Sequence, residues 1–217
     1  MSGLGILFMR RGIQAHPSAG ADYIKFKDEA VFNLLMSKGI SADGVGITKD
    51  DAAKVTTIST WFKNNNAITS FDEFVHFTSI ESLEYQAFYG CLSLNSIAFP
   101  PSLKTSGAQT FLNDTALVNV NMGGLRDLQG YAMKNIGATF IELPDTIATI
   151  GVQALAFNKN LEIVIARPVT PPTIDTTFLA QCNKLIAIYV PDESLSAYLT
   201  AWSAYATKIK PLSEYQG

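Results

Sequence analysis

Cysteine and histidine are scarce in this chain, since only two of its 217 residues are cysteine and only two are histidine. His16 and His76 lie in different segments, and a structural metal site needs clustered Cys or His ligands. The chain also lacks the GxSxG, phosphate-loop, HExxH and CxxC spacings, and nothing brings two of its acidic pairs together across a cleft. We therefore predict a protein that is not an enzyme and that uses no metal or cofactor.

Charge is also low, and it excludes one class of partner. Charged residues make up 16% of the chain, the net charge is −3, and no basic run is long enough to follow a phosphate backbone. We predict no nucleic-acid partner. No apolar run approaches the roughly 18 residues that a membrane helix needs, so we predict no membrane span.

The first residues, "MSGLGILFMRR", place their arginines after the short apolar run instead of before it. A secretory signal has the opposite order and a small-residue cleavage site. We therefore expect no signal peptide.

Apolar residues, by contrast, make up 47% of the chain and recur with a period of 22 to 23 residues. Four copies of a repeat begin at Ile80, Leu103, Leu125 and Ile147. A fifth, divergent copy occupies "FLAQCNKLIAIYVPDES". Five copies exceed the three or so that a solenoid needs to bury a continuous core.

Three further positions recur within the copies. Eight residues after each start stands an apolar residue, in turn Phe88, Phe111, Met133 and Leu155. Six residues later three copies carry leucine, namely Leu94, Leu117 and Leu161, whereas the third copy is one residue shorter there. A β-branched residue then follows in every copy, as Ile97, Val120, Ile141 and Val164. This pattern predicts one coil per copy, with the same apolar positions stacked from coil to coil.

The segments "LNSIAF", "LVNVNM", "TFIELP" and "LIAIYV" are expected to be short strands, one per coil, that pair in parallel about 4.8 Å apart. The prolines in "FPPS", "LPDT" and "VPDE" end these strands, because proline has no N–H to continue a ladder.

The opening Leu or Ile, "YQAFYGC" or "GAQTF", the Leu-containing turn and "IxLPxS/T" resemble the BspA-like leucine-rich repeats. The resemblance covers about residues 80–191. It implies a mainly β and irregular solenoid of about five coils, built from short parallel strands. The following segment is similar to the C-terminal end of such proteins, and its apolar residues predict an amphipathic capping helix: Leu195, Tyr198, Leu199 and Trp202.

The two cysteines test this architecture. Cys91 and Cys182 occupy the same register in the first and fifth copies. Four coil steps place them roughly 19 Å apart, whereas a disulfide needs Cα atoms within about 7 Å. We predict two free, buried thiols.

The segment before the repeats has a helical pattern. Val31, Leu34 and Leu35 share one helical face, and Thr48 and Asp51 have the spacing of a capping box. The loop "ISADGVGITKDD" resembles a degenerate calcium loop of the EF-hand or dockerin kind, with Asp51 at its twelfth position. Other ligand positions in this loop offer no side-chain oxygen, namely Ile40, Ala42 and Gly44.

These readings divide the chain into four parts. We expect an extended anchoring segment over 1–22, a small helical subdomain over 23–63, the solenoid over 64–191 and a C-terminal cap over 192–217. Residues 64–80 form a first, atypical coil in this interpretation.

Two functions fit such a protein. BspA-like repeats suggest a bacterial cell-surface module for adhesion or protein binding. The leader "MRRGIQAHPSAGADYIKF" is similar to that of virion structural proteins from phages of Bacteroidetes, including crAss-like phages, which implies a fibre or decoration on a phage head or tail. We favour the virion role, with assembly in the host cytoplasm.

In that role the N-terminal segment binds other virion proteins of the capsid or tail. The residues expected to anchor it are Leu4, Ile6, Leu7, Phe8, Met9, Arg10 and Arg11. The repeat face is expected to meet a glycan or protein on the host surface. Fibres are commonly dimers or trimers, so a homo-oligomer is a further expectation.

Overall fold

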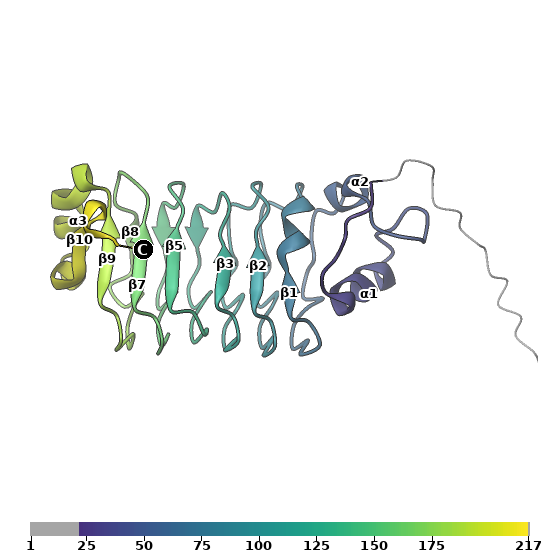
Figure 1. Ribbon diagram of the computed structural model, residues 1–217, viewed down its shortest axis with the longest axis horizontal. Coiled ribbons are helices and arrows are strands. Elements are labelled where there is room, and N and C mark those ends of the chain that lie inside the picture. Colours follow the sequence, from purple (N-terminus) through teal and green to yellow (C-terminus); the bar gives the residue numbers. More distant parts are fainter. Residues whose placement is uncertain (1–21, 217) are drawn as a thin grey trace, which may run out of the picture.

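The computed structural model describes residues 22–216 and has the form of a rod (Figure 1). Coils stack side by side along its length, and helices lie at both ends. The predicted mainly β leucine-rich repeat solenoid is confirmed.

Two short helices precede the coils, α1 at Glu29–Ser37 and α2 at Lys49–Ala53. Asp28 caps α1 and also accepts a hydrogen bond from the Thr69 hydroxyl at 2.7 Å, which ties this helix to the first coil. The predicted capping box between Thr48 and Asp51 is present at α2.

The strands expected from the repeats form one face of the rod, here called the strand face. Its elements are β1 (Ser70–Phe71), β2 (Ser96–Ala98), β3 (Asn119–Asn121), β5 (Phe140–Leu143), β7 (Ile163–Ala166), β9 (Ala187–Val190) and β10 (Ile209–Pro211). All of their pairings are parallel, and the β-branched positions pair directly, as Ile97 with Val120 and Ile141 with Val164. The sequence register of the coils is therefore confirmed.

A second parallel ladder, which the sequence reasoning missed, runs along a different side of each coil. It joins β4 (Asp127–Leu128), β6 (Thr149–Ile150) and β8 (Thr173–Ile174). Isolated bridges from Ser82 to Thr105 and from Thr105 to Asp127 extend this ladder toward the first coils. Where both ladders are present, neighbouring coils are joined on two sides, and amide-to-carbonyl bonds such as that from Phe111 to Ala132 join them on a third.

The stacked apolar positions fill the interior. Phe88, Phe111, Met133 and Leu155 are fully buried, and the rings of Phe88 and Phe111 stack 5.1 Å apart. That spacing matches one coil step, because the strands on the face set the same distance. One buried cluster continues from Ile24 to Ile209, so the helical ends share the core of the coils.

One repeat position inside the core is polar in two coils. Asn158 accepts a hydrogen bond from the Ile136 amide at 2.8 Å and donates one to the Met133 carbonyl at 3.1 Å. Asp114, two coils earlier, accepts from the Cys91 amide at 2.8 Å, but its Oδ2 is buried with no partner. Burial therefore raises the pKa of the Asp114 carboxyl to about 8.

The rod closes at its C-terminal end with α3 (Leu195–Ala201), flanked by short 3₁₀ helices at η2 (Asp192–Ser194), η3 (Ser203–Lys208) and η4 (Leu212–Glu214). Tyr198 and Trp202 are fully buried and donate hydrogen bonds to the Pro168 and Pro172 carbonyls at 2.8 and 2.9 Å. The predicted cap is confirmed, except that Leu199 remains 38% exposed.

Candidate functional site

The strand face is covered at its C-terminal half. Ile165 and Ala187 on β7 and β9 are buried, yet they lie outside the main core cluster. The C-terminal segment packs here, with the Tyr215 ring 5.0 Å from that of Tyr189 and 6.4 Å from that of Phe140. Among the described residues, this segment reaches Phe140 on β5 and leaves the strand face from β1 to β3 uncovered.

The open half contains a break in the ladder. β1, β2 and β3 form one sheet and β5, β7, β9 and β10 form another, with no pairing between β3 and β5. At the starts of β3 and β7, two successive amides share one carbonyl of the preceding coil, as Val118 and Asn119 do with Asn95. The third copy is one residue shorter here, and its Gly137 amide instead donates to the Leu117 carbonyl. The missing residue explains why β5 does not join β3.

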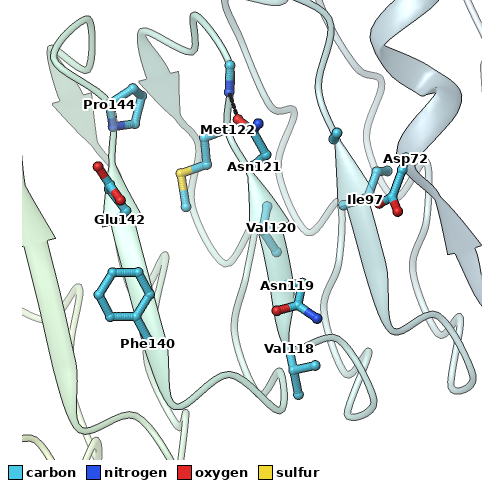
Figure 2. Close-up of a pocket in the computed structure, with 12 residues that line it drawn as sticks. Asp72, Ile97, Val118, Asn119, Val120, Asn121, Met122, Phe140, Glu142 and Pro144 are labelled. Carbon is cyan, nitrogen blue, oxygen red and sulfur yellow. Dashed lines mark hydrogen bonds between the residues drawn. The ribbon is translucent and has the colours of Figure 1, made fainter. Parts of the chain in front are cut away.

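A groove of about 660 Å³ lies over this break and is shown in Figure 2. Its twelve lining residues come from η1 (Asp72–His76), β2, β3 and β5 and from the residues next to these strands. The Met122 side chain points into the space between β3 and β5, opposite Phe140 and Glu142 (Figure 2).

The break leaves half-buried one core position that the other coils bury fully. Ile97, Ile141 and Val164 occupy the β-branched core position and are at most 3% exposed, whereas Val120 at the same position is only half-buried. Val118 and Phe140 are 37% and 38% exposed. Val118, Val120 and Phe140 thus give the groove apolar surface.

Two carboxylates stand at its sides, and no Lys or Arg lines it. Asp72 pairs with Lys27 at 3.0 Å, and Glu142 pairs with Arg167 at 2.6 Å. Both are solvent-exposed ion pairs, which contribute about 0–1 kcal/mol each and exchange readily with a ligand's charges.

The groove suits binding more than acid–base chemistry, since its two carboxylates lie on different elements and are each neutralised by a cation. In the described part of the chain, no three His, Cys, Asp or Glu side chains gather where they could hold a metal ion. Within residues 22–216, no helix is long and apolar enough to cross a membrane.

The calcium-like loop is organised by its own side chains. Asp43 accepts hydrogen bonds from the Tyr23 hydroxyl and from the Val45 amide, which lowers the pKa of Asp43 to about 2. Asp51, the expected twelfth-position ligand, is occupied in the capping box with Thr48.

The predicted thiols are confirmed as free and buried. Cys91 and Cys182 donate to carbonyl oxygens of the preceding coils, at 3.0 Å to Phe62 and 3.1 Å to Leu155. The predicted anchoring residues, from Leu4 to Arg11, lie outside the described residues. The residues of the groove were not singled out from the sequence, although the shortened third copy was a signal for it.

The fold and its partly open strand face define a leucine-rich repeat solenoid with a surface for binding. The sequence matches the BspA type leucine rich repeat region in six copies, over residues 53–164 and 81–208. The chain belongs to this family, whose repeats support a protein-binding module.

Two solved structures share the fold. One is a leucine rich cell surface protein from Faecalibacterium prausnitzii, with 24% identity and a TM-score of 0.51 over 59% of this chain and 33% of that chain. The other is a leucine-rich repeat protein from Bacteroides ovatus, with 24% identity and a TM-score of 0.53 over 62% of this chain and 34% of that chain. This chain thus spans about a third of each. No curated protein matches.

Proposed function

We propose that this protein is a non-enzymatic structural protein of a phage particle that uses the open half of its strand face to bind a protein or glycan on the host surface. The observation that carries the binding role is the groove between β3 and β5, where a ladder that is otherwise continuous leaves apolar side chains and strand edges open. Such surfaces are typical of protein-binding sites.

The place on a phage particle is supported by the leader that follows Phe8, which is similar to that of virion proteins. In this proposal residues 4–11 hold the chain on the capsid or tail, and the rod projects outward. Its groove lies between coils, away from both helical ends, so a partner can reach it while the N-terminal end is held (Figure 1).

Binding is tested with purified fluorescent protein and intact bacteria from the native source. Phe140→Glu places a charge in the groove and is expected to reduce cell binding at least tenfold. Val169→Glu, at a loop valine that is 62% exposed outside the groove, is the matched control and should bind like the parent. Equal binding by all three proteins would refute the groove as the binding surface.

Placement is tested by limited trypsin digestion with mass spectrometry. We expect cleavage after Arg10 or Arg11 in the purified protein and protection of both sites in phage particles. The alternative is a bacterial cell-surface adhesion protein, which the described cell surface location of the F. prausnitzii structure favours. Peptides of the repeats released by trypsin from intact, uninfected cells would support that alternative and overturn the virion role.

A further inference from the structure

The break between β3 and β5 leaves main-chain groups of both strands without partners. In a parallel ladder, alternate residues direct their N–H and C=O groups to the same neighbour. Asn119 donates to Asn95 and Asn121 accepts from Phe99, so these two β3 residues are bonded to β2. The N–H and C=O of Val120, which lies between them, therefore point toward β5, and within residues 22–216 no strand pairs with them.

The edge of β5 that faces β3 offers the main-chain groups of two residues. Thr139 and Leu143 accept hydrogen bonds from amides of the next coil, so these residues point toward β7. Phe140 and Glu142 alternate with them and direct their main-chain groups toward β3, where they form no main-chain hydrogen bond to the described residues. An unpaired edge of this kind binds an added extended segment through main-chain hydrogen bonds.

Hydrogen bonds between the two coils close the gap at both ends. The Gly137 amide donates to the Leu117 carbonyl at 3.0 Å before the strands, and the Thr146 hydroxyl donates to the Leu125 carbonyl at 2.8 Å beyond them. The groove of about 660 Å³ is therefore a slot of limited length. Residues 118–123 along it span about 20 Å at about 3.3 Å per residue, which is the length of about six extended residues.

The apolar side chains of the slot indicate one half of the pattern of a matching segment. Met122 lies between the two strands, and its unbranched side chain adapts readily to a neighbour (Figure 2). Val118 and Val120 add apolar surface beside it. Successive side chains of an extended segment face opposite sides, so every second residue of the segment should be apolar.

The residues between the apolar ones face outward and meet negative charge. Asp72 and Glu142 line the groove, and among the described residues no Lys or Arg lines it. The side chains of their present partners, Lys27 and Arg167, are 68% and 41% exposed, so they can turn into solvent when another cation arrives. This complementarity favours a segment with basic residues over one with acidic residues.

We infer that the groove binds an extended protein segment in which apolar and basic residues alternate, and that this segment pairs as an added strand with the open edge of β5. The inference rests on the binding role proposed for the groove and names the chemistry of its partner. Main-chain hydrogen bonds supply affinity for an extended chain, whereas the apolar side chains and the two carboxylates of the groove select its sequence.

Peptide binding to the purified full chain, followed by fluorescence anisotropy, tests the added strand. The probe is the labelled peptide acetyl-VKVKVK-amide, and acetyl-VEVEVE-amide should bind at least tenfold more weakly. Two further peptides carry N-methyl groups on every valine or on every lysine of the probe. At least one of them should bind at least tenfold more weakly than the probe, because alternate amides of a strand face the same edge. Equal binding of all four peptides, or binding of none, overturns the inference.

Two measurements locate the peptide on the protein. Exchange of the Phe140 and Glu142 amides with solvent should slow at least tenfold at saturating probe. Glu142→Gln should weaken probe binding at least threefold, whereas Glu81→Gln, at an exposed glutamate outside the groove, is the matched control and should change nothing. Unchanged exchange of both amides overturns the pairing with β5.

Cell binding separates this inference from the proposed function. Binding that depends on Phe140 should vanish after the bacteria are treated with proteinase K and survive mild periodate oxidation of their glycans. The opposite result overturns the inference, identifies a glycan as the partner and leaves the groove as the binding surface. Cell binding that Phe140→Glu leaves unchanged is the separate failure of the proposed function.

Discussion

Replacing Asp114 by asparagine should stabilise the protein, and the gain should grow with pH. Asp114 is fully buried with one carboxylate oxygen unpaired, whereas Asn158 at the same repeat position satisfies both ends of its amide. In the Asp114→Asn variant, Oδ1 keeps the bond from the Cys91 amide, and Nδ2 can donate to the Phe88 carbonyl, the equivalent of the Met133 carbonyl.

The size of the effect follows from the pKa of Asp114, which burial raises from 3.8 to about 8. Between these values the folded protein keeps a proton that the unfolded chain releases, so the free energy of unfolding falls as pH rises and levels off above about pH 8. A pH of 7 lies roughly three units above the ordinary pKa of 3.8, and each unit lowers the free energy of unfolding by about 1.4 kcal/mol. The stability lost at pH 7 through Asp114 is therefore at most about 4 kcal/mol. We expect a gain of about 2–4 kcal/mol at pH 7 and less than about 1 kcal/mol at pH 4.

Urea unfolding at pH 4, 5.5, 7 and 8.5 measures this difference, with the fluorescence of Trp61 and of the buried Trp202 as the signal. Asp145→Asn is the control, because Asp145 is exposed on a turn and its replacement should shift no midpoint. A gain for Asp114→Asn that is the same at pH 4 and pH 8.5 would refute the reasoning.

Three further outcomes are expected. Gly107→Ala should lower the free energy of unfolding by about 3 kcal/mol, because Gly107 has φ +70° and its added Cβ would lie 2.4 Å from a backbone carbonyl. Gly39→Ala, at a glycine with φ +74° and open space around it, should lower it by about 1 kcal/mol. Equal losses in urea unfolding would contradict this explanation. Trp202→Ala should cost about 3–5 kcal/mol by removing the buried centre of the cap, and an unchanged midpoint would show that the cap adds no stability. Cys91 and Cys182 should resist a thiol reagent at pH 8 in the folded protein, because burial raises the pKa of Cys91 to about 12 and also raises the pKa of Cys182. In guanidinium, two thiols per chain should react. Reaction of either thiol in the folded protein would argue against its burial.

Much of the coil register could be predicted from the sequence, because a solenoid must place the same kind of side chain at the same point of every turn. This recurrence is visible in the sequence at Phe88, Phe111 and Met133, and these side chains are stacked in the structure. The capping box at Thr48 was readable for a similar reason, since two side chains at a fixed spacing form it.

The second ladder was not readable, because its strands are two residues long and their surface positions hold Thr or Asp. Their second residues, Leu128, Ile150 and Ile174, do recur with the repeat, but two residues are too few to show the alternation of a strand. The break beside Val120 follows from one missing residue in the third copy. A sequence shows that a copy is short, but which hydrogen bonds are lost depends on how the neighbouring coils are placed.

The two ladders have different continuity, and this has a mechanical consequence. The strand face is interrupted between β3 and β5, whereas the bridge from Thr105 to Asp127 carries the second ladder past the same point. A sideways load on the rod would therefore concentrate its bending at this joint. The second ladder, together with the bonds from the Phe111 and Asn113 amides to the Ala132 and Lys134 carbonyls, would serve as the spine of a hinge. The groove would widen or narrow as the two halves of the rod tilt.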